Sequence, residues 1–276
     1  MKKLLSVAVI VSLGVAADIM PYGAYLDYSS NALKDNGYVL GVYGSLLKKQ
    51  YKFELDAEHT NIKYKKSANL DDWKQTDLTF VANYYKGYNY AFKAGIHNIW
   101  TKQGGNNEYD KVFVLGGLYY EYLKYNAGAD FYYSDYKDFN VYQISPKIGF
   151  NFGHYNSNTG SFYAEATYNY IHISDKIKAG SNKNNYSNLD IKLQNFKGSW
   201  TSTINLSLGK NAYKVANGGF VVYNLGEEYK YSADFSVQYA INKNDNIKVS
   251  YSRSKYNNGS EDSYSNVYSI FYLRAF

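Results

Sequence analysis

Apolar and polar side chains alternate along most of this 276-residue chain. In residues 51–62, the odd positions as far as Ala57 are aromatic or aliphatic, and the even positions as far as Glu58 are charged. Successive side chains of a β-strand point to opposite faces, so this period of two predicts strands with one apolar and one polar face. The same period returns in residues 88–100, 123–133, 197–209 and 229–241.

Nine further segments bring the number of predicted strands to 14. Their ranges are 18–29, 37–47, 73–85, 111–121, 139–152, 161–173, 212–223, 246–256 and 264–276. Segment 212–223 is the least regular, because Gly218 and Gly219 interrupt it; we interpret the pair as a bulge. Both chain ends are expected on the same side of the fold, which requires an even number of strands, and the alternative count is 12.

The connections between these strands differ in length. Short connections are expected at 47–51, 86–88, 121–123 and 242–245, and longer polar ones at 63–72, 101–110, 174–196 and 257–263. Short turns on one side and long loops on the other are typical of an up-and-down barrel. We expect the Asn-rich loop 174–196 to be a mobile outer loop, or to fold inward and constrict a pore.

The segment 264–276 carries large side chains on one face, and Arg274 interrupts that row. Such a strand is needed where a barrel closes, because an unpaired strand edge cannot be left in a membrane. We therefore predict that it pairs with 18–29, and Arg274 marks either a membrane rim or a shift of register. The residues expected on the lipid-facing side of this closing strand are Tyr268, Ile270, Tyr272 and Phe276.

The N-terminal residues 1–17 read as a secretory signal peptide: Lys2 and Lys3 precede an apolar run that ends in small residues. The chain contains 35 Tyr and no Cys. Tyr suits surfaces that are apolar on one side and wet at the edge, as at the two interfaces of a membrane. The net charge of +6 is dispersed along the chain, so nucleic-acid binding is not expected.

In its signal peptide, alternating strands, abundant Tyr and terminal Phe276, the chain resembles the bacterial outer-membrane β-barrel superfamily, and within it small single-chain porins. The resemblance implies an all-β fold: an antiparallel up-and-down transmembrane β-barrel over residues 18–276. It further implies export through the Sec pathway, insertion by the barrel-assembly machinery, and contact with outer-membrane lipids and lipopolysaccharide. We expect a monomer without cofactor or metal.

The function expected for such a barrel is a porin-like channel for passive diffusion of small hydrophilic solutes or ions, not an enzyme. An alternative is a structural or adhesion barrel whose lumen is filled by side chains. The alternation also places Asp27 and His97 on the lumen face. The carboxylates on 51–62 are expected to pair with Lys residues of neighbouring strands rather than to form a cation-selective patch or a calcium site. The predicted pore-lining residues are Lys52, Glu54, Asp56, Glu58, Asp77, Lys93, Lys124, Asp130, Lys147, Glu165, Lys230, Asp234 and Lys248.

A second alternative is a hydrolase of outer-membrane lipids. His172 and Ser174 lie two residues apart, so both would share the lipid face of a strand, and an imidazole can accept a hydroxyl proton. Outer-membrane lipid hydrolases carry a similar pair, but here Asp175 and Lys176 follow, and no orienting partner is evident. We therefore interpret His172 as a residue at the end of a strand and Ser174 as the start of a loop, rather than as a catalytic pair.

Overall fold

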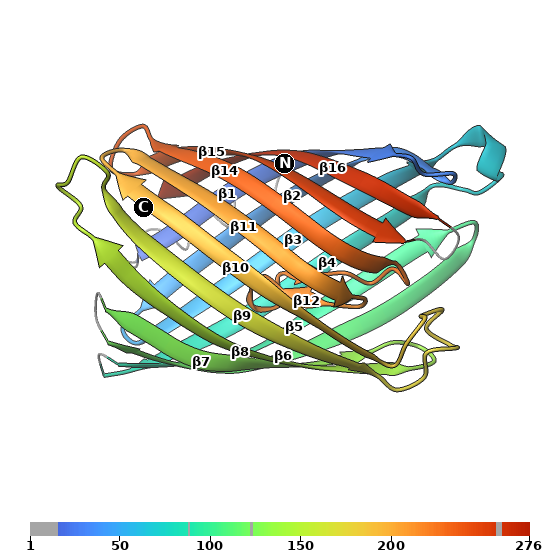
Figure 1. The fold of residues 1–276 in the computed structure, drawn as a ribbon, viewed down its shortest axis with the longest axis horizontal. Coiled ribbons are helices and arrows are strands. Elements are labelled where there is room, and N and C mark those ends of the chain that lie inside the picture. Colours follow the sequence, from blue (N-terminus) through green and yellow to red (C-terminus); the bar gives the residue numbers. More distant parts are fainter. Residues whose placement is uncertain (1–15, 88, 122–123, 258–260) are drawn as a thin grey trace, which may run out of the picture.

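The structure is a computed structural model that describes residues 16–87, 89–121, 124–257 and 261–276. In this part of the chain, fourteen long strands close into one antiparallel barrel (Figure 1). Most of the predicted signal peptide 1–17 lies outside the described residues. The strands are β1 (Ala16–Ser29), β2 (Lys34–Lys48), β3 (Tyr51–Tyr64), β4 (Trp73–Lys86), β5 (Tyr90–Gln103), β6 (Asn106–Glu121), β7 (Tyr125–Asp135), β8 (Asn140–Gly153), β9 (Ser161–Ile173), β10 (Asn185–Lys197), β11 (Trp200–Asn211), β14 (Glu228–Ala240), β15 (Asp245–Asn257) and β16 (Asp262–Ala275).

The outer face of the wall is apolar. The side chains of Leu55, Phe80 and Phe131 are exposed on the outside. Aromatic pairs on adjacent strands form a belt at each end of the barrel. Rings lie 4.6 to 5.3 Å apart at the short-turn end in Trp200–Tyr239, Tyr51–Tyr84 and Tyr90–Tyr119, and 5.3 Å apart at the other end in Trp100–Tyr109 and Tyr133–Tyr142. Within the described ranges, no helix has the length and apolar character to span a membrane.

Strand β16 closes the barrel against β1, as predicted. The register runs from Asp18 opposite Ala275 to Ser29 opposite Tyr264, and the Phe276 amide donates to the Ala17 carbonyl at 2.8 Å. The side chains of Tyr268, Ile270, Tyr272 and Phe276 are exposed on the outer face.

Arg274 causes no shift of register. It stays directly opposite Asp245 of β15, and its Nη1 lies 3.6 Å from the Asp245 Oδ1 atom. Its side chain is half exposed and its guanidinium carbon lies 5.6 Å from the centre of the Phe276 ring. Arg274 therefore belongs to the rim at the short-turn end.

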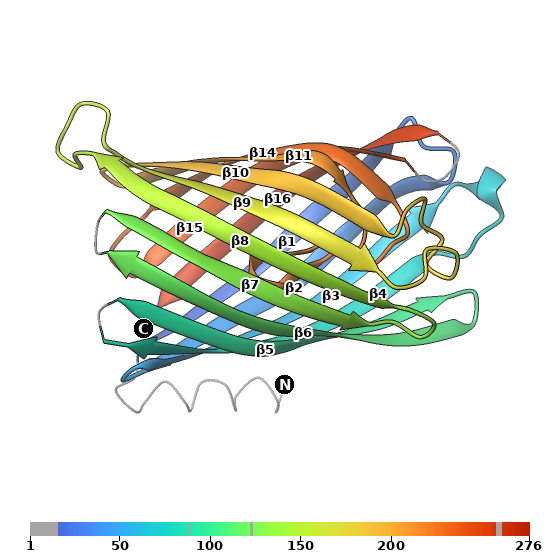
Figure 2. The ribbon, with the colours of Figure 1, turned by 60° about the horizontal axis from the view of Figure 1, so that its bottom comes forward.

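The count of 14 is correct, but two of the predicted elements are wrong. The predicted loop 174–196 contains the transmembrane strand β10 (Asn185–Lys197), and the predicted strand 212–223 does not belong to the wall. The predicted loop 101–110 is a tight hairpin, because β5 and β6 extend to Gln103 and Asn106 and leave only Gly104 and Gly105 as the turn. Figures 1 and 2 show the β3–β4 and β9–β10 connections at one end and the C-terminus at the other.

Candidate functional site

Residues 212–227, here called the lumenal segment, leave the wall after β11 and fold into the barrel before β14 begins (Figure 1). The segment contains a short hairpin. Its strands β12 (Val215–Ala216) and β13 (Val221–Val222) are two residues long, and the 3-10 turn η3 (Asn217–Gly219) lies between them. Its backbone has φ of 55° at Tyr213 and 107° at Gly219. The left-handed backbone at Tyr213, a non-glycine residue, departs from the extended conformation just after β11 ends, where the chain turns into the lumen.

Side chains of the opposite wall hold the tip of the lumenal segment. The Gln143 side chain from β8 donates to the Val215 carbonyl and accepts from the Val215 amide, both at 2.8 Å, so it replaces a missing strand partner. The His97 Nδ1 atom from β5 lies 2.9 Å from the Gly219 carbonyl and 2.7 Å from Thr79 Oγ1. The amide and carbonyl of Val215 and the carbonyl of Gly219 thereby find partners within the lumen.

Two ion pairs fix the ends of the segment. Lys34 of β2 lies 2.5 Å from Glu227, with both side chains almost fully buried, and Lys214 lies 2.7 Å from Asp190 of β10. Burial lowers the pKa of Lys214, and the Asp190 carboxylate opposes that shift. These contacts join the segment to strands on both sides of the barrel.

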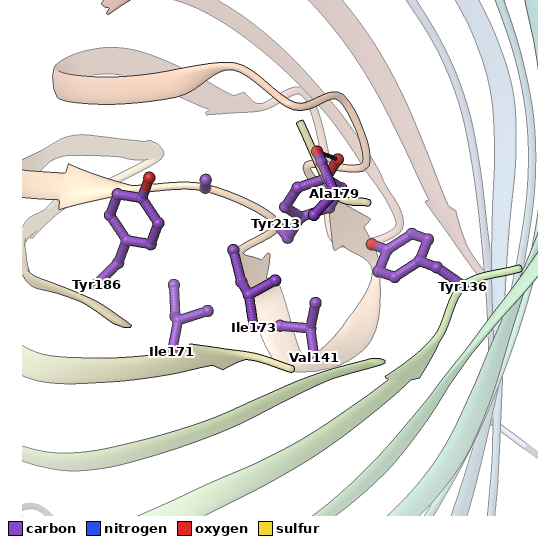
Figure 3. Close-up of a cluster of buried hydrophobic side chains, with 8 residues drawn as sticks. Tyr136, Val141, Ile171, Ile173, Ala179, Tyr186 and Tyr213 are labelled. Atoms are coloured by element: carbon purple, nitrogen blue, oxygen red, sulfur yellow. Dashed lines mark hydrogen bonds between the residues drawn. The ribbon is translucent and has the colours of Figure 1, made fainter. Parts of the chain in front are cut away.

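Apolar contacts complete the attachment. Val215 packs in a cluster with Ile99, Val112, Val114 and Tyr132. A second cluster lies where the segment leaves the wall: the Tyr213 ring is 5.2 Å from that of Tyr136, and the Tyr213 hydroxyl donates to the Ala179 carbonyl at 2.5 Å (Figure 3). The segment thus has a packed apolar base as well as polar tethers.

A cavity of about 580 Å³ remains between the lumenal segment and the wall of β7 to β11 and β14 to β16. Most of its lining is polar, with Ser, Thr, Asn and Gln beside charged groups. Its acidic residues are Asp130, Glu165, Asp190 and Asp234, and its basic residues are Lys147, Lys192, Lys214 and Lys248. The lumen is therefore neither empty nor completely filled, and the space that is left carries both signs of charge.

Strand β3 places its predicted lumen residues inside the barrel, but not in the expected ion pairs. Lys52 lies 2.9 Å from Glu54 on the same strand. The Tyr22 hydroxyl lies 3.0 Å from Asp56 Oδ2 and 2.8 Å from Glu58 Oε2, so these two carboxylates share a neutral partner. The expectation that this row pairs with Lys residues of neighbouring strands is wrong, because no cation reaches it within 4 Å among the described residues except Lys52.

Eight other predicted residues do lie in the lumen, where they form ion pairs, line the cavity or do both. Asp130 binds two lysines, Lys93 at 3.0 Å and Lys147 at 2.8 Å, and Asp77 lies 3.3 Å from His97. Glu165, Asp234 and Lys248 line the cavity.

Three residues assigned to the lumen face lie elsewhere. Lys124 is in the turn between β6 and β7. Lys230 sits at a bulge in β14 and lies 2.5 Å from Asp262, which also binds Lys255 on the outer side of the wall. Asp27 is on the outward face with the exposed Tyr25, and it accepts a hydrogen bond from Asn266 at 3.0 Å.

Sequence reasoning missed several lumen residues. Asp190 and Lys192 were hidden in the predicted loop 174–196, and Lys214 in the predicted strand 212–223. The alternation of Leu189, Ile191 and Leu193 with polar neighbours is the signal that could have found β10.

His172 and Ser174 use separate partners. The His172 Nδ1 atom lies 2.8 Å from Asn185 Oδ1, and the Ser174 hydroxyl oxygen accepts from the Asn140 amide at 2.9 Å. His172 shares the outward face of Tyr170, as the alternation predicted. The geometry does not form the nucleophile and base pair that acyl transfer requires. In the described part of the chain, no three His or carboxylate side chains gather in a way that could hold a metal ion.

No protein-family model and no curated protein sequence matches this chain. Solved structures with a similar fold include the CymD monoaromatic hydrocarbon channel, with a TM-score of 0.62 and 12% identity over 95% of this chain and 88% of that chain. The Ralstonia pickettii toluene transporter TbuX has a TM-score of 0.60 and 12% identity over 95% and 90% of the two chains. The Acinetobacter baumannii outer membrane protein Omp33 has a TM-score of 0.50 and 9% identity over 95% of this chain and 100% of that chain. The shared fold is that of outer-membrane β-barrels.

Proposed function

We propose that the chain is an outer-membrane channel through which small hydrophilic solutes or ions diffuse passively. The observation that carries this proposal is the charged and polar lining of the cavity beside the lumenal segment. Water and polar solutes replace one another there at small cost, whereas an apolar solute would strip water from charged groups without compensation. Four acidic and four basic residues balance in the lining, so size and polarity, more than net charge, would select the solutes.

A channel for apolar solutes is the second candidate, because two similar structures are a monoaromatic hydrocarbon channel and a toluene transporter. In this chain, the apolar lumen patch formed by Ile99, Val112 and Val114 is fully buried under Val215. An apolar solute would have to displace the lumenal segment to reach it. The present arrangement therefore favours hydrophilic solutes.

The two aromatic belts support a place in the bacterial outer membrane, where Tyr and Trp rings sit at headgroup level beside lipids and lipopolysaccharide. Export through the Sec pathway, assembly by the barrel machinery and a monomeric state remain predictions. Chemical cross-linking in detergent checks the last of these, with a single band of monomer size as the expected result.

The test is reconstitution of the refolded barrel into planar bilayers and liposomes. We expect discrete steps of ionic conductance, and entry of small sugars at rates that fall with solute size. Boiled protein serves as the control. Folded protein that gives neither conductance nor sugar entry would contradict a diffusion channel, and toluene uptake without sugar entry would favour the second candidate.

A further inference from the structure

Four charged side chains of the cavity have no ion-pair partner in the described part of the chain. Two other pairs in its lining are neutralised directly, Lys147 with Asp130 and Lys214 with Asp190. Among the described residues, no opposite charge lies within 4 Å of the side-chain charges of Glu165, Lys192, Asp234 or Lys248, all of which face the same space. The cavity thus offers two positive and two negative groups that remain available.

Neutral side chains hold these four charges in place. The Tyr163 hydroxyl donates to Glu165 at 2.6 Å, and the Lys192 Nζ atom lies 5.9 Å from the centre of the same Tyr163 ring. On the facing strands, the Asn205 amide donates to Asp234 at 2.7 Å, and the Lys248 Nζ atom lies 4.0 Å from the centre of the Phe271 ring. A hydroxyl, an amide or a ring positions a charge without cancelling it, whereas an ion pair would cancel it.

The strand register alternates the signs around this wall. Glu165 of β9 is directly opposite Lys192 of β10, which is opposite Asn205 of β11, which is opposite Asp234 of β14. Adjacent strands are about 4.8 Å apart, so backbone positions of opposite charge follow one another at roughly 5 to 10 Å. A small molecule that carries both an ammonium and a carboxylate group can meet both signs at once.

We propose that this cavity selects zwitterionic solutes, namely α-amino acids and short peptides. The inference rests on the proposed channel function and names its substrate class. Lys192 and Lys248 would receive the carboxylate, and Glu165 and Asp234 the ammonium group. A singly charged solute satisfies only one pair, and a neutral one satisfies neither. The volume of about 580 Å³ lies within the range of about 300–1,000 Å³ for small-molecule sites.

The experiment compares four solutes of nearly equal size: alanine, its cationic amide alaninamide, the anion lactate and the neutral lactamide. Initial rates of entry into proteoliposomes are measured by mass spectrometry, beside ionic conductance of the same preparation. We expect alanine to enter about fivefold faster than lactamide, the ratio expected when exposed charge contacts together supply ~1 kcal/mol. Alaninamide and lactate should fall between them.

Two double variants separate the roles of the signs. The double variant Lys192→Gln, Lys248→Gln should make alanine enter no faster than alaninamide. The double variant Glu165→Gln, Asp234→Asn should make alanine enter no faster than lactate. Lys111→Gln is the matched control, because Lys111 also lies beside a ring, 5.0 Å from the centre of Tyr109, but on the outer wall. It should leave the order of rates unchanged. Should a double variant fail to fold, Lys248→Gln and Asp234→Asn alone should each halve the corresponding advantage.

The outcomes distinguish this inference from the proposed channel. Equal entry of all four solutes with normal conductance overturns the zwitterion site and leaves the channel standing. Fastest entry of lactate or of alaninamide also overturns the zwitterion site, since a site for one sign would then be present. Absence of both entry and conductance overturns the channel itself.

Discussion

Lys34 and Glu227 form a buried ion pair in the lumen. Their side chains are 6% and 10% exposed, and the ammonium group of Lys34 also lies 5.2 Å from the Tyr28 ring and 5.6 Å from the Tyr256 ring. Both charges have lost their water, so each depends on the other. The pair joins the last residue of the lumenal segment to β2, on the far side of β1 and β16.

Replacement of Glu227 by Gln should lower the free energy of unfolding by ~3 kcal/mol, because it leaves a buried ammonium group without its counter-charge. Urea unfolding of the barrel in detergent micelles, followed by Trp fluorescence, measures the change. The control is Arg274→Gln, which breaks a rim pair whose Arg side chain is 53% exposed and should cost less than ~1 kcal/mol. Equal losses in the two variants would show that Glu227 does not act as a buried anchor.

Replacing the polar lumen residue Gln143 by an apolar one should release the lumenal segment at Val215. Gln143→Leu keeps a similar volume but removes both hydrogen bonds to Val215. Since each lost bond leaves a buried backbone group unsatisfied at a cost of ~1–3 kcal/mol, we expect frequent current fluctuations between two levels. Single-channel recordings detect them, and a trace as quiet as that of the unchanged chain would contradict this role of Gln143.

At the scale of the element, the lumenal segment limits the free cross-section. Replacing residues 214–222 by a short Gly-Ser linker removes β12, η3 and β13, together with the Gln143 and His97 contacts. We expect the single-channel conductance to rise several-fold and larger sugars to enter liposomes. An Ile177→Ala variant, in the exposed β9–β10 loop, is the control and should leave conductance unchanged.

The same segment shows where the sequence pattern stops being informative. Alternation predicted thirteen of the fourteen wall strands, because a strand that faces lipid outside and water inside must alternate. β10 was missed since its first residues, Asn185 to Asn188, are polar on both faces apart from Tyr186. Segment 212–223 is predicted as a wall strand because the number of strands must be even, although neither of its faces is uniformly apolar.

The side-chain partners in the lumen were even less accessible from the sequence. Alternation assigns a face to each residue, but it does not give the register that brings Asp130 to Lys93 and Lys147. A bulge between Tyr229 and Tyr231 moved Lys230 out of the predicted row, and a bulge of one residue leaves little trace in the pattern. The neutral partners Tyr22 and Tyr163 depend on packing across several strands.

For the whole molecule, the pairing of β16 with both β1 and β15 decides whether the barrel exists. Ile270 lies opposite Gly23 on one side and Val249 on the other. Ile270→Pro should prevent closure, because proline removes a ladder donor in a strand that has no free edge. Gel electrophoresis of unheated and boiled samples should show two mobilities for the unchanged chain and for Ile270→Val, and one for Ile270→Pro. A heat-dependent shift in the proline variant would mean that closure tolerates the defect.

The strands on either side of the lumenal segment pair directly with each other, Ser207 with Ser232 and Leu206 with Ala233. The barrel therefore has two parts that depend on different contacts. The wall depends on the register of every neighbouring pair, whereas the lumenal segment depends on two adjacent strands at its ends and on anchors such as the Lys34–Glu227 pair. Mutations in the lumenal segment that spare these anchors would change the free cross-section of the lumen and leave the register of the wall strands intact. The same wall can therefore hold lumenal segments of different length and charge, and each of them would leave a different free cross-section in the lumen.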